Sequence, residues 1–451
     1  MEKQWGSWLY GITLKTNTTT DTHNTRDYCD NHGYYIGVIF EDKMSEKKSP
    51  IPIFDSLEYV DKSIVPKPKY FLSKDEDFYH SLSFLKCYKG SIGTFNSYRR
   101  EVERIIHWTQ NIANKSLQEL NKTDIEEYIK FCQNPPKNWI GVKKVPRFLD
   151  RNGERVPNPG WRPFVVTISK SSHKQGKQID IEEFNLSQGA IKELFAVLST
   201  FFNYLIQEEY MNMNPVALIR QKSQFIRKQQ NQTQIRRLSS LQWEYVIETA
   251  AIMARLNPER HERTLFIMTA LYSMYLRISE LAASERWIPK MCDFYRDRDG
   301  NWWFRTVGKG NKERQIAVSN KMLDALVRYR NFLGLSPYPS LTDQTPILKK
   351  HKGNGPITST TYIREIVQEC FDAGILQLEK DKHFEEANSL NEATVHWLRH
   401  TGISDDVQHR PREHVRDDAG HSSSATTDKY IDVELRERHK SAKDKPLLFD
   451  N

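Results

Sequence analysis

Apolar residues recur at three- and four-residue steps in several stretches between residues 73 and 222. This spacing places them on one face of an α-helix, so each stretch predicts an amphipathic helix. Thr94 is predicted as the N-cap of the first, the run Asn121-Lys122-Thr123-Asp124 is predicted to cap the second, and Ser187 precedes the longest. The residues that carry the three patterns are Ile92, Phe95, Tyr98, Val102, Ile105, Ile106 and Trp108, then Ile125, Tyr128, Ile129 and Phe131, then Ile191, Leu194, Phe195, Val197, Leu198, Phe201, Phe202 and Leu205. Residues 73–222 are therefore predicted to form an all-helical domain.

This pattern is interrupted at residues 137–178, which are poor in helical periodicity and rich in Pro, Gly and Lys. The insertion carries ten Lys or Arg residues against two acids, a net charge of +8 that equals the excess of the whole chain. Four aromatic residues are interleaved, and cationic side chains beside aromatic rings suit a sugar-phosphate backbone. We interpret the insertion as a DNA-contacting hairpin or flap, with a solvated loop as the alternative. Its predicted DNA-binding residues are Lys143, Lys144 and Arg147.

A second basic segment, residues 217–237, is rich in Gln and Asn and contains no acid. A flexible cationic linker can lie along DNA while the domains on either side bind it. An exposed linker without DNA contact is the alternative. Residues 223–237 are predicted to be the linker proper. The predicted DNA-binding residues of this segment are Arg220, Lys222, Arg227, Lys228, Arg236 and Arg237.

Residues 1–72 precede the helical domain and form an N-terminal extension of unknown role. They contain short β-like runs followed by a Pro-rich stretch, with nine Lys or Arg against ten Asp or Glu residues. A DNA-reading module is one interpretation. The near-neutral charge favours the other, a capping or partner-binding segment.

A second patterned domain is predicted over residues 238–440. Its helical stretches flank one clear β signal at residues 302–318, where two strand-like runs surround a Gly-Asn turn. We therefore expect a β-hairpin with Lys309 at its tip, and a C-terminal tail at residues 441–451. The fold class is mainly α: a helical domain plus an α+β domain with a small antiparallel sheet.

The composition limits the number of domains, the kind of partner and the cell compartment that we expect. The chain has 451 residues, too many for one compact core, and a net charge of +8 that favours a polyanionic partner. Its five Cys residues are widely spaced, which argues against a cysteine zinc site or a disulfide scaffold and fits a reducing cytoplasm. The N-terminus lacks a secretory pattern, and the most apolar stretch, residues 194–206, is too short to span a bilayer. We expect a cytoplasmic protein without a membrane partner.

The C-terminal half carries the residue types needed to displace a phosphodiester oxygen. Negative charge grows on the phosphate oxygens during displacement, and the planar fork of Arg binds such oxygens in pairs. Arg277 and Arg399, both within helical patterns, are the candidates for this role. Glu280, three positions after Arg277, could orient that side chain.

Tyr430 is the candidate nucleophile. A phenol titrates near pH ~10, so it needs a base or a cationic neighbourhood to attack at neutral pH. His396 could accept its proton, Lys309 could protonate the leaving 5′-oxygen, and His421 could donate to a non-bridging oxygen. His400 is expected to make a structural hydrogen bond.

In this order and spacing, the candidate residues resemble the active site of the tyrosine recombinase (phage integrase) family. The resemblance covers about residues 240–435, and the helical region before it resembles the core-binding domain of that family by pattern. The motifs that carry it are Leu276-Arg277-x-Ser279-Glu280-Leu281, Gly308-Lys309-Gly310-Asn311-Lys312-Glu313-Arg314, His396-x-x-Arg399-His400, Gly420-His421 and Tyr430 nine residues after His421.

The resemblance implies a site-specific DNA recombinase or integrase of a mobile element or phage, associated with the nucleoid. Two domains would clamp duplex DNA at a specific recombination site, and Tyr430 would form a 3′-phosphotyrosyl link that a 5′-hydroxyl reverses. The exchange conserves bond energy, so no ATP, metal or other cofactor is expected.

The resemblance also implies an assembly. Four protomers would form a homo-tetramer around two sites, while off DNA the chain would be a monomer or weak oligomer. Accessory DNA-bending or directionality proteins would be further partners. The tail, with the apolar run Leu447-Leu448-Phe449, would dock on a neighbouring protomer or pack on its own.

One departure from the family stands out at residues 417–419. Asp417 and Asp418 stand where the family usually has two apolar residues, after the strongly charged segment 409–416. Three other classes stay open: a DNA-binding protein of this fold that does not cut, a type IB topoisomerase, and a zinc hydrolase that uses His396 and His400.

Overall fold

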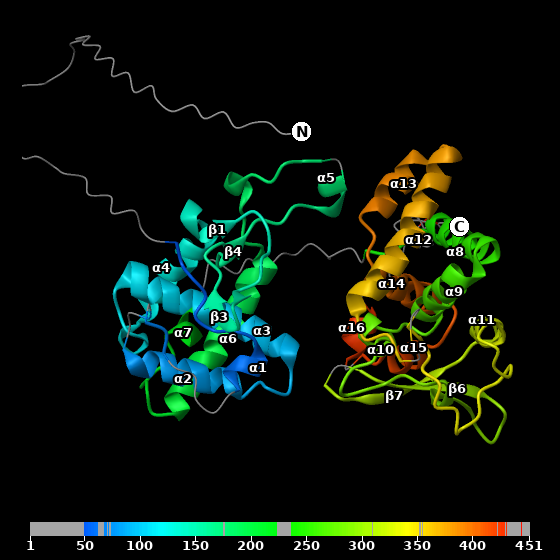
Figure 1. Cartoon of the computed structure of the whole chain (residues 1–451), viewed down its shortest axis with the longest axis horizontal. Helices are drawn as coiled ribbons and strands as arrows, with labels where there is room; N and C mark the ends of the chain where they lie inside the picture. The colour runs from blue at the N-terminus through cyan, green and yellow to red at the C-terminus, as the bar shows by residue number, and fades with distance from the viewer. Residues whose placement is uncertain are drawn as a thin grey trace, which may run out of the picture. The chain divides into compact units, whose positions relative to one another are not determined.

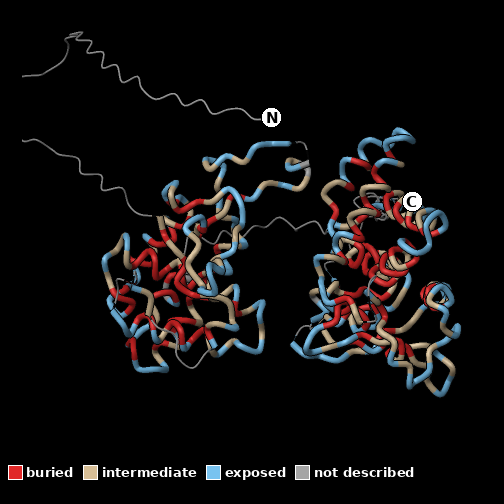
Figure 2. The backbone as a smooth tube through the Cα atoms, in the orientation of Figure 1, coloured by how far each residue is buried: buried red, intermediate tan, exposed pale blue. Residues whose placement is uncertain are grey.

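The structure of the chain is a computed structural model (Figure 1). The described residues are 49–61, 67–69, 71, 74–174, 176–222, 236–308, 310–350, 353, 355–421, 423–428, 430 and 443. Buried hydrophobic residues fall into two large clusters, one within residues 53–219 and one within residues 238–398. Figure 2 shows the buried backbone gathered inside each of these two parts.

The N-terminal part is built mainly from helices. Its helices are α1 (Leu57–Val60), α2 (Asp75–Lys86), α3 (Ile92–Trp108), α4 (Lys122–Gln133), α5 (Lys170–Lys174), α6 (Gln188–Gln207) and α7 (Pro215–Lys222). A π-helical turn at Thr109–Ala113 continues α3, and short 3-10 turns lie at Leu117–Glu119, Lys137–Trp139 and Ile181–Glu183. Helices α2, α3 and α6 pack on one another, and α7 packs on α4 and α6.

Two of the three predicted helix starts are confirmed. Asn121 accepts from the backbone amides of Thr123 and Asp124 at the start of α4, and Ser187 caps α6. The third was wrong: α3 begins at Ile92, so its N-cap lies three residues before Thr94. Ser91 is its N-cap, because the Ser91 hydroxyl accepts from the Thr94 amide.

Helix α6 is the centre of the N-terminal core. Its 20 residues make it the one helix, among the described residues, long and apolar enough to cross a membrane by length and composition. The apolar stretch 194–206 lies within this longer helix. Eight of its apolar residues are buried against α2, α3 and α7, as expected of a core helix.

The basic insertion is partly ordered into strands. Strand β1 (Ile140–Gly141) pairs in parallel with β4 (Phe164–Val165), and β2 (Phe148–Arg151) forms an antiparallel hairpin with β3 (Glu154–Pro157). Asn152 and Gly153 make the turn with φ of 51° and 82°. Trp139 and Phe164 are buried in the core, so the insertion is anchored rather than a fully solvated loop.

A buried carboxylate joins three segments of this part. Glu103, on α3 and 1% exposed, accepts from the backbone amides of Ile53 and Phe54 and pairs with Arg147. The Arg147 guanidinium also lies 4.7 Å from the centre of the Trp161 ring. The predicted N-terminal extension therefore contributes to the helical core, since Ile53, Phe54, Val60 and Phe71 belong to it.

The C-terminal part combines helices with one small sheet. Its helices are α8 (Ser240–Leu256), α9 (Pro258–Ser273), α10 (Ile278–Leu281), α11 (Asn320–Phe332), α12 (Thr360–Lys380), α13 (Phe384–Asn391), α14 (Val395–Asp406), α15 (Arg412–Ala419) and α16 (Ser424–Asp428). The strands are β5 (Phe294–Arg296), β6 (Trp302–Val307) and β7 (Glu313–Ala317), in the order β5-β6-β7 and antiparallel throughout. The mainly α fold class with a small antiparallel sheet is confirmed.

The predicted hairpin is also confirmed, as the pair β6–β7. Val307 pairs with Glu313, and the Gly308 amide donates to the Lys312 carbonyl at 2.8 Å. Gly310 and Asn311 have φ of 77° and 59°, the left-handed region that a tight turn between twisted strands requires. Lys309, predicted at the tip, lies outside the described residues.

Removal of the Arg147 side chain is expected to destabilise the N-terminal part. Arg147→Ala leaves the buried Glu103 carboxylate without its counter-ion and should lower the free energy of unfolding by about 3 kcal/mol. Urea-induced unfolding of the full chain measures this. Lys144→Ala, at an exposed lysine of the same insertion, is the control and should stay within about 0.5 kcal/mol of the parent. Equal stability of the two variants would contradict a structural role for Arg147.

Candidate active site

Helix α14 carries three of the predicted residues. His396 and His400 are one helical turn apart, and Arg399 lies between them on a more buried face. The helix packs against α9, α12 and α15. This packing brings it close to the segments that hold Arg277 and Tyr430.

Among the predicted cations whose side chains the structure describes, Arg399 is the most buried, with 2% of the residue exposed. One nitrogen, Nη1, donates to the carbonyl of Tyr275, and Nη2 donates to the carbonyl of Ala419 at 2.6 Å. The same Nη2 lies 3.3 Å from Nε2 of His421. Burial, then Arg277 and Arg314, lower the pKa of Arg399 to about 9, so it stays charged at neutral pH.

Arg277 stands at the N-cap of α10, with extended backbone, rather than inside a helix as predicted. The carboxylate of Glu280 accepts from the Arg277 amide at 2.7 Å, as in a capping box, so the helix begins after Arg277. Glu280 Oε1 also accepts from Arg277 Nη1 at 3.1 Å, as the predicted supporting role requires. Glu280 is 1% exposed, so this pairing is internal.

Arg314 on β7 is a site residue that the sequence reasoning missed. Its guanidinium forms a two-pronged pair with Glu280, at 2.7 and 2.9 Å. Gly420 and Gly308 leave room for it: a Cβ at Gly420 would lie 2.8 Å from Arg314 Cδ, and one at Gly308 3.4 Å from Nη1. The sequence feature that could have indicated Arg314 is its position in the motif that follows Lys309. The alternation of side chains along the strand did not by itself show that Arg314 faces Glu280.

Tyr430 is buried, and its phenol oxygen lies 2.6 Å from Nδ1 of His400. The His421 ring stacks on the Tyr430 ring with centroids 5.7 Å apart. His396, the predicted base, packs its ring edge-on against that of His400 at 4.5 Å. The imidazole that meets the phenol is thus His400, to which the sequence assigned only a structural hydrogen bond.

Burial and crowded cations keep these groups neutral. Burial first, then His396, Arg399 and His421, lower the pKa of His400 to about 4. Burial raises the pKa of Tyr430 above its usual value, although Arg399 and Arg277 oppose the increase. At neutral pH the site therefore pairs a neutral phenol with a neutral imidazole that can accept its proton.

His421 is held from both sides. Its Nδ1 lies 2.9 Å from the hydroxyl of the buried Thr427 on α16, and its Nε2 faces Arg399. Gly420, with φ of 63°, ends α15 in the left-handed conformation and turns the chain toward the site. The pKa of His421 falls to about 4, mainly through burial and then Arg399.

The remaining predicted residues are only partly described. Gly308, next to the undescribed Lys309, lies against Glu280, so this end of the hairpin is beside the arginine cluster. The exposed residues are Lys143, Lys144 and Arg236, whereas Arg237 lies 3.9 Å from Asp405. The backbone of Arg220 and Lys222 belongs to α7, but their side chains, and all of Arg227 and Lys228, lie outside the described residues.

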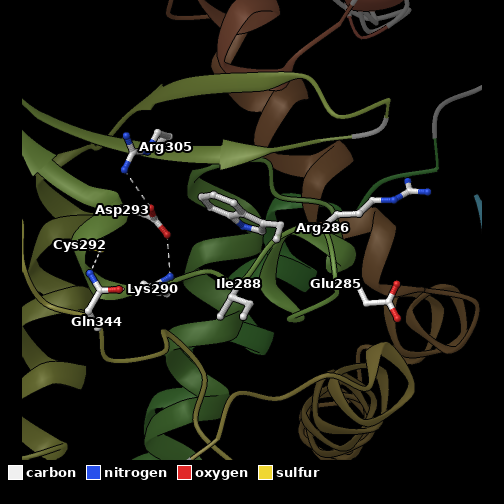
Figure 3. Close-up of a pocket in the computed structure, with 9 residues that line it drawn as sticks. Glu285, Arg286, Ile288, Lys290, Cys292, Asp293, Arg305 and Gln344 are labelled. Carbon is white, nitrogen blue, oxygen red and sulfur yellow. Dashed lines mark hydrogen bonds and ion pairs between the residues drawn. The ribbon is translucent and has the colours of Figure 1, made fainter. Parts of the chain in front are cut away.

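A separate cavity of about 460 Å³ lies beside the sheet (Figure 3). Figure 3 shows Arg305 directed toward Asp293 and Lys290 close to the same carboxylate. Its lining residues are Glu285, Arg286, Trp287, Ile288, Lys290, Cys292, Asp293, Arg305 and Gln344. None of the six predicted catalytic residues lines it, so the candidate site is not this cavity.

The arrangement suits attack on a bound anion. Arg277 and Arg314 share a single carboxylate, Glu280, and the guanidinium of Arg399 is held by two backbone carbonyls, so a net positive charge remains next to the phenol of Tyr430. Fixed guanidinium groups of this kind stabilise negative charge that develops on a phosphate during displacement.

Comparison with known proteins finds relatives that cover part of the chain. No family model matches it. It is 26% identical over 273 residues to a tyrosine recombinase XerC of Haemophilus ducreyi, covering 60% of this chain and 74% of the relative. It is 24% identical over 323 residues to a tyrosine recombinase XerD of Staphylococcus saprophyticus, covering 69% of this chain and 94% of the relative. A solved structure of a XerH site-specific recombinase bound to a palindromic difH substrate aligns with a TM-score of 0.49 and 15% identity, over 84% of this chain and 91% of that one.

Proposed function

The chain belongs to the tyrosine recombinase family, and on that premise we propose that it is a site-specific DNA recombinase whose nucleophile is Tyr430. The observation that carries the proposal is the contact between the Tyr430 phenol and the His400 imidazole, 2.6 Å apart, beside the buried guanidinium of Arg399. A nucleophile, a neutral proton acceptor and a fixed cation are the three parts that phosphodiester attack needs.

The reaction follows from the chemistry of these groups. The Tyr430 oxygen attacks a DNA phosphate, a 3′-phosphotyrosyl bond forms, and the 5′-oxygen of the next nucleotide leaves with a proton. Arg277 and Arg399 bind the phosphate oxygens, His421 donates a further hydrogen bond, and Lys309 protonates the leaving oxygen. A 5′-hydroxyl of a second duplex reverses the bond. No ATP, metal or other cofactor enters this sequence because the phosphotyrosyl bond retains the energy of the broken one.

His400 is the better-placed proton acceptor in the described conformation. Its Nδ1 lies within hydrogen-bond distance of the phenol, and its pKa of about 4 leaves it unprotonated at neutral pH. His396, the residue predicted from sequence, contacts the His400 ring instead. We assign proton acceptance to His400 and treat His396 as the alternative.

DNA with specific recombination sites is the partner that this function requires. The exposed lysines Lys143 and Lys144 on the insertion, and Arg236 beside the C-terminal part, are the proposed phosphate contacts outside the site. Integration or excision of a mobile element or phage, a homo-tetramer on paired sites, accessory bending proteins and association with the nucleoid belong to the same proposal. Docking of the 441–451 tail on a neighbour does too, although its apolar run lies outside the described residues.

Covalent capture tests the proposed nucleophile. Sheared genomic DNA is incubated with the protein in the presence of a chelator, the reaction is stopped with detergent, and DNA attached to protein is sequenced. Wild-type protein should yield fragments clustered at one sequence. Tyr430→Phe lacks the attacking oxygen and should yield none, while its affinity for the same DNA stays unchanged.

The other outcomes separate the alternatives. Attachment scattered without sequence preference indicates a topoisomerase, and loss of activity in chelator indicates a zinc hydrolase. DNA binding without any adduct indicates a protein of this fold that does not cut.

The assignment of the base predicts a pH profile and a difference between two matched variants. His400→Asn should lower the rate of adduct formation by about 100-fold or more, because the phenol loses its acceptor, whereas His396→Asn should have a smaller effect. Since the pKa of His400 is lowered to about 4, the wild-type rate should not fall between pH 8 and about 5 through protonation of this ring, and should fall below that. The opposite ranking of the variants, or a decline centred near pH ~6.5, would show that His400 is not the base.

The insertion should contribute to DNA affinity through its exposed lysines. The double variant Lys143→Gln, Lys144→Gln is expected to bind the captured site more weakly. Its slope of log affinity against log salt should fall by about 0.9 for each DNA phosphate that the variant no longer neutralises. A double variant of two exposed lysines on α4, Lys122→Gln, Lys130→Gln, provides the charge-matched control. If both double variants behave alike, the insertion does not contact DNA.

A further inference from the structure

The two carbonyls that hold Arg399 come from chain segments with unusual backbone. Tyr275 follows the end of α9 and has φ of 49°, a left-handed conformation that an aromatic residue rarely adopts. Ala419 is the last residue of α15, just before the left-handed Gly420. Neither carbonyl is fixed by a long helix or strand, so something else must hold both segments against Arg399.

Arg410 is in contact with both segments. Its Nη1 donates to the Tyr275 hydroxyl at 2.9 Å and to Asp406 at 3.1 Å, and its Nη2 donates to Asp418 at 2.6 Å. The Tyr275 hydroxyl also donates to Asp406, which lies on the same helix as Arg399. One guanidinium therefore ties the residue before Ala419 to the side chain of Tyr275.

Asp418 extends this network to the sheet. It is 5% exposed, and its second oxygen accepts from the Ala317 amide at the end of β7, 3.2 Å away. A buried carboxylate is costly without a partner, and Arg410 is that partner. Arg410, from the charged segment before Gly420, and Asp418, the acid found where the tyrosine recombinase pattern has an apolar residue, thus form one ion pair in which the carboxylate is buried.

We propose that Arg410 is a positioning residue for Arg399: through Tyr275 and Asp418 it fixes the two carbonyls that aim the Arg399 guanidinium at the phosphate. The inference rests on the proposed function, because it assumes that Arg399 binds the phosphate under attack. Arg410 itself does not touch the reacting atoms in this arrangement.

A cavity of about 410 Å³ makes the network accessible to small ions. Tyr275, Asp406 and Arg410 line it together with Gly402 on α14, Lys321 on α11 and residues of the loop between β7 and α11. Truncation of Arg410 to alanine would therefore leave a space that free guanidinium ion can enter, between carboxylates that already bind a guanidinium group.

The experiment measures adduct formation on the captured DNA at saturating DNA, in single turnover. Arg410→Gln should lower the rate constant on the order of 10- to 100-fold, the range seen when supporting partners of metal ligands are removed. DNA affinity should be unchanged. Arg412→Gln, the same charge change at an exposed position two residues on, is the matched control and should retain the parent rate. Tyr275→Phe, which removes a single hydroxyl, should give a smaller loss in the same direction.

A double-variant cycle separates positioning from general damage to the fold. In an Arg399→Lys background the forked guanidinium is gone, so the further change Arg410→Gln should cost little additional rate. Millimolar guanidinium should restore a part of the rate of Arg410→Ala and leave Arg412→Ala unaffected. Circular dichroism melting of each variant shows whether the fold is retained.

The outcomes distinguish failure of the positioning role from failure of the proposed function. The positioning role would be overturned if the rate losses of Arg399→Lys and Arg410→Gln multiplied in the double variant. It would also be overturned if Arg410→Gln kept the parent rate, or if Tyr275→Phe formed the adduct more slowly than Arg410→Gln. Absence of any adduct from the wild-type protein would instead overturn the proposed function, and the inference with it.

Discussion

The buried guanidinium of Arg399 is the interaction on which the C-terminal part depends. A charge that is 2% exposed needs compensation, and here two backbone carbonyls, from Tyr275 and Ala419, supply it. Because those carbonyls belong to segments far apart in sequence, satisfying one side chain joins α9, α14 and α15. Without that compensation, the site would carry an unpaired charge in its core.

Burial and the nearby cations together set the protonation of the imidazoles and of the phenol in the candidate site. Glu280 is shared by Arg277 and Arg314, so the two arginines outnumber the carboxylate between them. Burial first, and then neighbouring cationic groups, Arg399 among them, lower the pKa of His400 and of His421. Burial raises the pKa of the Tyr430 phenol, because it disfavours the charged form of a phenol as it does that of an imidazole. Positive charge next to the phenol is thereby combined with a neutral proton acceptor.

Ion pairs also hold the N-terminal part together, and they show that some of its basic residues have structural roles. The insertion is strongly basic, yet Arg147 pairs with the buried Glu103 and Arg155 pairs with Asp55 at 2.8 Å. These cations hold the segment around residue 55 on the helical core. Local net charge therefore overstates how many of them face a partner, and the exposed Lys143 and Lys144 remain the better candidates for DNA contact.

Sequence by itself determined what depends on neighbours a few residues apart. The caps at Asn121 and Ser187 and the hairpin around the Gly-Asn turn follow from local backbone chemistry. The motif spacing predicted the candidate site residues on α14 and Tyr430, whose side chains meet in the structure. Tertiary structure decided which imidazole meets the phenol, that Arg314 shares Glu280, and that Arg410 lies behind Arg399. Those contacts join residues 30 to more than 100 positions apart, and spacing along a chain cannot specify such distances, because they follow from how helices and strands pack.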